Sequence, residues 1–286
     1  MKSHHFWKPF AVVVIAMSLL GACADKDDIK TTGMIASKDG TPIRYQSQGE
    51  GETAIVFIHC WTCDHSFWNG QYHVLADKYK VVRMDLAGHG TSAGRKTYTM
   101  QSYGEDVVAV SRALRLERVV LVGHSMGGPV AVEAEKILGD KVIGVVGVDT
   151  FHTAFVYPKD EEGINNFVKP FIENFADTRK GMMHSMFAPG ADPELVNKTS
   201  VAIPQSAEDM AVQSMYDIFR WSARENPVAL DALGNKLRNI NGNPDGKGEP
   251  LHDSVTLIPG TGHFPHMEKP AEFNTALRSI VEELDK

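Results

Sequence analysis

The chain has 286 residues, of which 43% are hydrophobic and 23% are charged, with a formal net charge of −7 at pH 7. This length and apolar content are sufficient for one large globular domain that carries an insertion. The excess of acidic side chains argues against nucleic-acid binding, because the overall field of the protein repels phosphate.

The first 25 residues predict export. Lys2 and Lys8 precede an apolar run over residues 10–20, which is shorter than the about 20 residues that a helix needs to cross a bilayer. A basic start followed by a short apolar run is typical of a secretory signal. The run ends in Leu20-Gly21-Ala22-Cys23, which resembles the lipobox of bacterial lipoproteins.

The lipobox resemblance implies cleavage before Cys23 and a lipid on that cysteine. We therefore expect a signal peptide over residues 1–22, a polar tether over 23–31, and a membrane-anchored protein that faces the periplasm. Ala24 after the cysteine favours the outer membrane by the rules of that family. Loss of 1–22 removes two lysines and no acid, so the net charge becomes −9, and attachment would depend on the lipid. An ordinary signal peptide with a chance cysteine is the alternative.

Beyond the tether, strand-like and helix-like segments alternate. This alternation favours an α/β fold in which a mostly parallel central sheet is flanked by helices on both faces. Asp39-Gly40, between two short strand-like segments, predicts a hairpin. The expected strands are residues 34–37, 42–47, 54–58, 81–85, 119–123, 142–148, 237–241 and 254–258.

The stretch over residues 151–227 interrupts this rhythm, because its apolar residues follow helical spacing. We expect a core formed by residues 32–150 and 228–286, with a helical lid over 151–227 inserted after the sixth strand, above the C-terminal edge of the sheet. The lid is rich in large apolar side chains, which predict an apolar substrate, although packing within the lid is the alternative for most of them. They are Phe151, Phe155, Met182, Met183, Met186, Phe187, Met210, Met215 and Trp221.

The segment Gly123-His124-Ser125-Met126-Gly127 carries the first chemical signal. It is a G-x-S-x-G motif between an apolar strand and a helix, which is the context that this motif requires. A very tight turn must project the serine above the sheet, and the small residues around it allow that turn. A glycine-rich turn that only packs is the alternative.

Three further motifs occur in the expected order. They are His59-Cys60-Trp61 after a strand, the segment 85–92 (DLAGHGTS), and Gly260-Thr261-Gly262-His263 after the last strand. Together with the serine motif, they resemble the α/β-hydrolase superfamily, in its serine esterase-like branch, over roughly residues 30–286.

The resemblance implies a role for each matching residue. Ser125 would attack an acyl carbon, and His263 would accept its proton and later protonate the leaving group. The backbone N–H groups of Trp61 and Met126 would form the oxyanion hole. No cofactor or metal is implied. Other polar residues of the motifs are expected to pack, or to organise their own loops: Asp85, His89, His124 and His266.

The catalytic acid has more than one candidate. The family usually places it after the penultimate strand, as a glycine followed three residues later by aspartate, and Gly242 and Asp245 match this spacing. Only 18 residues separate Asp245 from His263, so we expect the intervening helix to be reduced to a loop. We prefer Asp245 and keep two alternatives, Asp149 at the end of the preceding strand and Asp253. A solvated aspartate in a surface turn is the competing interpretation of Asp245.

Cys60 and Cys63 form a C-x-x-C pattern within the same loop. No second cysteine pair supports a zinc site, and the signals of a thioredoxin-like fold are lacking. We interpret this segment as the oxyanion loop, in which a Cys60–Cys63 disulfide could form in an oxidising periplasm. A thiol–disulfide protein is a further alternative.

We therefore predict a serine hydrolase that cleaves a carboxylic ester, lactone or thioester of small to medium size. Related enzymes with an aspartate nucleophile, the dehalogenases and epoxide hydrolases, are disfavoured by Ser125. A ligand receptor with little turnover is an alternative of another class, as are a cofactor-free perhydrolase and a C–C hydrolase.

Overall fold

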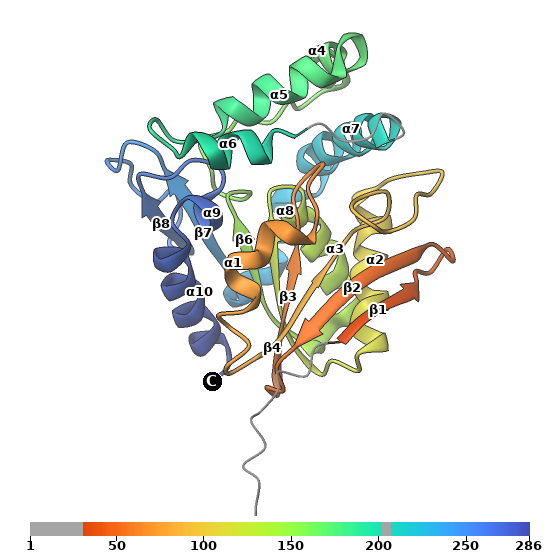
Figure 1. The fold of residues 1–286 in the computed structure, drawn as a ribbon, viewed down its shortest axis with the longest axis vertical. Helices are drawn as coiled ribbons and strands as arrows, with labels where there is room; N and C mark the ends of the chain where they lie inside the picture. Colours follow the sequence, from red (N-terminus) through yellow and green to blue (C-terminus); the bar gives the residue numbers. More distant parts are fainter. Residues whose placement is uncertain (1–30, 202–206) are drawn as a thin grey trace, which may run out of the picture.

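The computed structural model describes residues 31–201 and 207–286, which form one central sheet with helices on both faces and a group of helices above one end (Figure 1). The sheet has eight strands. They are β1 (Thr31–Ala36), β2 (Pro42–Gln48), β3 (Thr53–Ile58), β4 (Lys80–Met84), β5 (Arg118–His124), β6 (Val142–Val148), β7 (Leu237–Asn243) and β8 (Val255–Pro259).

The strand order is β1-β2-β4-β3-β5-β6-β7-β8. β1 pairs with β2, and β2 with β4, in antiparallel fashion, and every other neighbouring pair is parallel. Each of the predicted strands is present, with ends that differ by at most a few residues, so the expected fold class is confirmed. Because the C-terminal ends of parallel strands meet at one edge, the loops that follow β3, β5, β6, β7 and β8 lie close together.

Helices of the core cover the two faces of the sheet. α1 (Asn69–Tyr72) and α10 (Pro270–Leu284) lie on one face, and α2 (Met100–Ala113) and α3 (Gly127–Leu138) on the other (Figure 1). The short remaining elements are η1 (His65–Trp68), η2 (Gly139–Lys141), η4 (Gly234–Lys236) and α9 (Pro265–Glu268).

The sheet separates two hydrophobic cores, because successive side chains along each strand point to opposite faces of the sheet. In β3, Val56 and Ile58 pack into the core under α2 and α3, whereas Ile55 and Phe57 pack into the core under α1 and α10. All four are fully buried, and each such side chain contributes about 1.5–3 kcal/mol through burial. A strand buried on both faces explains why this segment reads as a continuous apolar run.

The lid lies between β6 and β7, and helices form it from Glu161 onwards, after an irregular segment over residues 151–160. Its helices are α4 (Glu161–Glu173), α5 (Phe175–Ser185), α6 (Pro193–Thr199) and α7 (Glu208–Arg224). The expected boundary between lid and core, at residues 227 and 228, falls inside the next helix, α8 (Asn226–Leu233). Asp160 caps α4 by accepting a hydrogen bond from the N–H of Gly163 at 2.8 Å. Phe171 and Phe219, on the apolar faces of the lid helices, belong to the same hydrophobic core as side chains of α2 and α3. This packing anchors the lid to the rest of the protein.

The proposed signal peptide, Cys23 and all of the tether except Thr31 lie outside the described residues, and Thr31 belongs to β1. Within residues 31–201 and 207–286, none of the helices combines the length and the apolar character needed to cross a membrane.

Candidate active site

Ser125 occupies a strained turn between β5 and α3. Its φ is +52°, a left-handed conformation that is uncommon for a residue with a side chain. Its N–H donates to the carbonyl of Val148 at 3.0 Å, and its carbonyl accepts from the N–H of Gly128 at 2.9 Å. A Cβ on Gly123 would collide with the carbonyl of Gly127, so the tight turn requires glycine there. The structure thus bears out the geometry expected of the G-x-S-x-G segment.

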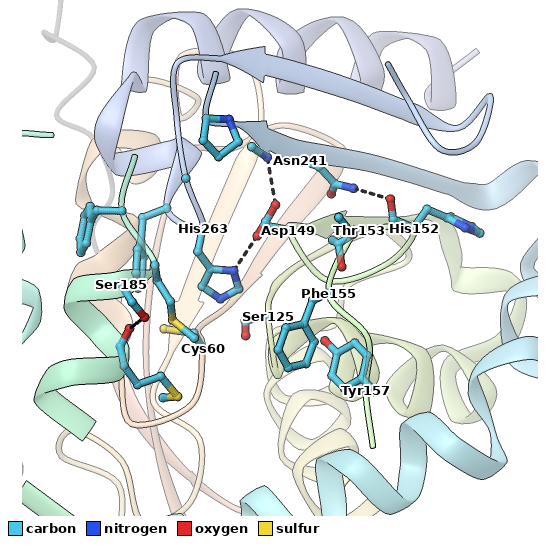
Figure 2. Close-up of a pocket in the computed structure, with 18 of the residues that line it drawn as sticks. Cys60, Ser125, Asp149, His152, Thr153, Phe155, Tyr157, Ser185, Asn241 and His263 are labelled. Atoms are coloured by element: carbon cyan, nitrogen blue, oxygen red, sulfur yellow. Dashed lines mark hydrogen bonds and ion pairs between the residues drawn. The ribbon is translucent and has the colours of Figure 1, made fainter. Parts of the chain in front are cut away.

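His263 pairs with Asp149. Nδ1 of His263 lies 2.6 Å from Oδ2 of Asp149, and Figure 2 shows the imidazole between that carboxylate and Ser125. The other carboxylate oxygen, Oδ1, accepts a hydrogen bond from the N–H of Gly242 at 2.9 Å. Asp149 has a φ of +46° directly after β6, and this turn directs its carboxylate towards the loop that follows β8. The carboxylate therefore fixes the orientation of the imidazole ring.

Asp245, the candidate that the sequence favoured, makes no such contact, and this expectation is corrected: the carboxylate that pairs with His263 is that of the alternative, Asp149. Asp245 is exposed in a turn, where its Oδ1 accepts from the N–H of Lys247 at 3.0 Å. Gly242 does have the spacing to Asp245 that the motif requires, but its N–H donates a hydrogen bond to the carboxylate of Asp149. The expected loss of the intervening helix is observed, since residues 244–254 contain no helix. Asp253 is also exposed.

The predicted oxyanion loop follows β3 and lies against the same site. Trp61 and Met126 both line the cavity that contains Ser125. In the described part of the chain, neither backbone N–H donates to a carbonyl of a loop or turn. A disulfide joins Cys60 to Cys63, with 5.2 Å between their Cα atoms, and it closes a short loop around Trp61. The cysteines thus form the bond that the sequence left open.

Two buried side chains, His89 and Arg179, hold this loop through Thr62. Nε2 of His89 accepts from the N–H of Thr62 at 3.3 Å, and Nε of Arg179, on α5 of the lid, donates to Oγ1 of Thr62 at 2.9 Å. Burial lowers the pKa of Arg179 to about 10. Nε1 of Trp61 donates to the carbonyl of Ala211 on α7 at 2.8 Å. The lid and the predicted oxyanion loop are therefore connected by polar contacts as well as by packing.

A cavity of about 1050 Å³ surrounds Ser125 and His263 and extends under the lid. Most of its wall is apolar, from Phe155, Tyr157, Phe167, Met182, Met183, Met186, Phe187, Met215 and Phe219. Phe151, Met210 and Trp221, which the sequence placed in the same group, are buried but do not line the cavity. For these three, packing within the protein is the correct interpretation.

Two further histidines lie beside the site. Nε2 of His124 hydrogen-bonds to the carbonyl of His263 at 2.7 Å, and His266 stacks on Trp68 with ring centroids 4.4 Å apart. Both nitrogens of His266 are buried without a partner among the described residues. Burial, assisted by the nearby His263, lowers the pKa of His266 to about 3, and burial also lowers the pKa of His124. Both are therefore neutral at pH 7, and they have the packing and hydrogen-bonding roles that the sequence predicted.

Asp85 and His89 organise loops, also as predicted, although His89 additionally contacts the loop after β3 through Thr62. Asp85 accepts hydrogen bonds from the N–H of His65 and from that of Thr91, each at 2.9 Å. Burial alone would raise the pKa of Asp85, but the bonds from His65 and the nearby His59 hold it well below its usual range. Asp64, His65 and Asp85 could together hold a metal ion, yet their oxygens already accept protein hydrogen bonds.

The structure adds residues that the sequence did not single out. Glu268 accepts from the N–H groups of Gly262 and Ala188, at 2.9 and 3.1 Å, and so ties the His263 loop to the lid. Asn241 lies at the C-terminal end of β7 and lines the cavity. A polar residue at a strand end could have signalled Asn241, whereas nothing local marks Glu268 or Arg179.

Comparison with known proteins agrees with this geometry. Residues 55–276 match the alpha/beta hydrolase family, and the chain belongs to that family. It is similar to 3-oxoadipate enol-lactonase 1 of Acinetobacter baylyi, with 38% identity over 100 residues, which are 35% of this chain and 38% of that protein. The match thus spans well under half the length of that curated relative.

Two solved structures resemble most of the chain. A thermophilic esterase from Thermogutta terrifontis superposes with a TM-score of 0.74 at 21% identity, over 90% of this chain and all of the other. Est816, described as an N-acyl homoserine lactone degrading enzyme, superposes with a TM-score of 0.70 at 26% identity, over 86% and 99% of the two chains. Together these superpositions show that the alpha/beta hydrolase fold extends over most of the chain.

Proposed function

We propose that the protein is a serine hydrolase that cleaves a carboxylic ester, lactone or thioester through an acyl-enzyme. One observation carries the proposal. Ser125 stands at a strained turn, inside an apolar cavity that also contains the hydrogen-bonded pair of His263 and Asp149. A nucleophile, a base and an acid that orients the base are the three parts that acyl transfer needs.

The roles follow from these positions. Oγ of Ser125 attacks the carbonyl carbon while Nε2 of His263 takes the hydroxyl proton. Asp149 holds the ring with Nδ1 protonated and stabilises the imidazolium that forms. The N–H groups of Trp61 and Met126 stabilise the oxyanion, each contributing about 3–4 kcal/mol. His263 then protonates the leaving group, and water releases the acyl group by the same steps in reverse order.

The walls of the cavity favour a small to medium apolar acyl group. Aromatic and methionine side chains line it under the lid, and burying an apolar chain against them is favourable by about 0.8 kcal/mol per methylene. Methionine adapts to different shapes, so we expect tolerance among short and medium chains. The chain is similar to an esterase, to an enol-lactonase and to an enzyme that degrades N-acyl homoserine lactones, which is compatible with either an open-chain ester or a lactone as substrate.

The test is the hydrolysis of 4-nitrophenyl esters of increasing acyl length by the wild-type chain and by Ser125→Ala. We expect multiple turnovers on short and medium acyl chains, and a loss of at least about 1,000-fold in Ser125→Ala. Equal activity in the two proteins would overturn the assignment of Ser125. A single burst without further turnover would instead favour a ligand-binding protein with the hydrolase fold.

We propose in addition that the mature protein is an exported lipoprotein, anchored through a lipid on Cys23 and facing the periplasm. The support is the arrangement of Lys2 and Lys8 before a short apolar run that ends in Leu20-Gly21-Ala22-Cys23. Cys23→Ser should prevent processing, or release the protein into the soluble fraction. A variant that is processed normally and stays in the membrane fraction would contradict this proposal.

A further inference from the structure

We propose that the side of the cavity next to His263 selects the charge of the leaving alcohol: it favours a cationic or hydrogen-bond-donating alcohol and disfavours an anionic one. This inference rests on the proposed ester hydrolysis and names the substrate class within it. It concerns the turn after β7, which includes Asp245, and the residues beside that turn.

The charges along the cavity all have one sign. Its lining includes the carboxylates of Asp149, Asp245 and Glu249, and no lysine or arginine from the described part of the chain. Lys247 lies on the same turn but does not line the cavity. Burial and the neighbouring His252 lower the pKa of His152, which therefore adds no positive charge at neutral pH. Of these acids, Asp149 is committed to His263, so Asp245 and Glu249 are available to a ligand.

A buried acceptor adds a second, independent indication. Asn241 lines the cavity and is only 3% exposed. Its Nδ2 donates to the carbonyls of Phe151 and His152, at 2.9 and 3.3 Å, whereas its Oδ1 is buried and has no partner among the described residues. A buried acceptor without a donor is costly. This oxygen has almost no exposed surface, so a ligand that brings an N–H or O–H group reaches it only with a small shift of the surrounding side chains, and an anion could not satisfy it.

The turn that carries Asp245 is held in place by its own hydrogen bonds. Asn243 accepts from the N–H of Gly248 and donates to the carbonyl of the same residue, both at 3.1 Å. Oδ1 of Asp245 accepts from the N–H of Lys247 at 3.0 Å. The carboxylate is therefore presented by an ordered turn, although it remains exposed, and its effect on a ligand is weakened by water.

The position of His263 determines which half of the ester, the acyl group or the alcohol, lies next to Asn241 and Asp245. The leaving oxygen must face the imidazole that protonates it, and this imidazole is anchored to Asp149 at the β7 side of the cavity (Figure 2). The alcohol half thus lies towards Asn241 and Asp245. The acyl half is left with the apolar wall formed by residues such as Phe167 and Phe219 of the lid.

The test uses butyrate esters that differ only in the charge of the alcohol. They are the esters of choline, of 3,3-dimethylbutan-1-ol, which is its uncharged isostere, and of 3-hydroxypropanesulfonate. We expect kcat/KM for the choline ester to exceed that of the uncharged ester about 5-fold, and the anionic ester to fall about 10-fold below it, because two partly screened carboxylates act on the charge. Both ratios should shrink as the ionic strength rises.

The variant Asp245→Asn/Glu249→Gln should bring the choline ratio close to one. Glu50→Gln/Asp140→Asn is the matched control. It makes the same change in net charge at two exposed positions that precede β3 and β6, at the opposite edge of the sheet, and should keep the preference. Equal rates for the three esters in the wild type, or a preference that survives in Asp245→Asn/Glu249→Gln, would overturn the inference while leaving ester hydrolysis intact.

The corresponding butyl ethers test the same preference without turnover. They cannot be hydrolysed, so their dissociation constants, measured by calorimetry, report the charge preference even in a protein that does not cleave the esters. Failure of the uncharged ester to react in a Ser125-dependent way would count against the proposed function alone. Tighter binding of the sulfonate ether than of the choline ether would count against the inference alone.

Discussion

The backbone N–H of His263 donates a hydrogen bond to the carbonyl of Met186, at 2.7 Å. His263 belongs to the loop after the last strand of the core, and Met186 directly follows α5 of the lid. The proposed catalytic base is therefore positioned by the lid as well as by the sheet, and a displacement of this part of the lid would move the imidazole.

Gly262 makes this close approach possible. A Cβ at this position would collide with the carbonyl of Met186, so Gly262→Ala must separate the loop from the lid. We expect kcat to fall about 100-fold, since a shift of about 1 Å in a reacting group has an effect of that size. Gly181→Ala in α5 is the control, because nothing lies within 4 Å of the added Cβ. That variant should keep its activity and gain slightly in melting temperature. An active Gly262→Ala would contradict the account.

The disulfide between Cys60 and Cys63 should matter for turnover but not for the chemistry itself. It closes the loop that carries the N–H of Trp61, and His89 and Arg179 also hold that loop. We expect Cys60→Ser/Cys63→Ser to lower kcat by roughly 10-fold on a short ester, through a less ordered oxyanion donor, with the fold retained. A complete loss of activity with an intact fold would instead favour chemistry at the cysteines.

The buried histidines make the fold sensitive to acid. The pKa of His266 is about 3 in the folded protein, against about 6.5 in an unfolded chain. Between these values the unfolded chain binds the extra proton, so the free energy of unfolding decreases as the pH falls from about 6.5 towards 3. The loss should approach, at most, about 1.4 kcal/mol per pH unit for each such histidine.

His266→Phe tests this source of acid sensitivity. Phenylalanine can keep the stack on Trp68, and the substitution removes no hydrogen bond from the described residues. We expect its melting temperature to fall less steeply between pH 6.5 and pH 4 than that of the wild type. His184→Gln, at an exposed position on α5, should leave the wild-type slope unchanged. Identical slopes for His266→Phe and the wild type would assign the acid sensitivity to other groups.

The acid of the triad can be tested by two matched substitutions. Asp149→Asn keeps the shape of the side chain but no longer favours the correct form of His263, so kcat should fall about 10,000-fold with little change in melting temperature. Asp245→Asn removes the same charge from an exposed turn and should keep kcat on an uncharged ester within an order of magnitude. A collapse of turnover in Asp245→Asn alone would restore the candidate that the sequence favoured.

The sequence predicts the sheet well for a physical reason. Strands such as β3 and β5 are buried on both faces, so their apolar runs are visible without knowledge of the fold. Ser125 and His263 are also recognisable, because each lies in a short glycine-containing motif. Gly123 is required by a contact within its own turn, although the contact that requires Gly262 is with the lid. In these cases the information is contained in neighbouring residues.

The choice between Asp149 and Asp245 as partner of His263 cannot be made from neighbouring residues. It depends on the direction that two loops take after β6 and β7, and a local rule of spacing cannot report that direction. Gly242 satisfies the rule, yet it supplies an N–H to the carboxylate of Asp149. The contact between Arg179 and Thr62 joins segments 117 residues apart, and no pattern within either segment predicts it.

The central claim is that Ser125 forms a covalent acyl-enzyme, and covalent labelling tests it most directly. The wild-type chain and Ser125→Ala are incubated with a fluorophosphonate, and residual esterase activity is followed together with intact mass and peptide mapping. We predict one label per chain, located on Ser125, with activity lost in proportion to labelling, and no label on Ser125→Ala. Full activity in a completely labelled protein, or stoichiometric labelling and turnover in Ser125→Ala, would contradict the account.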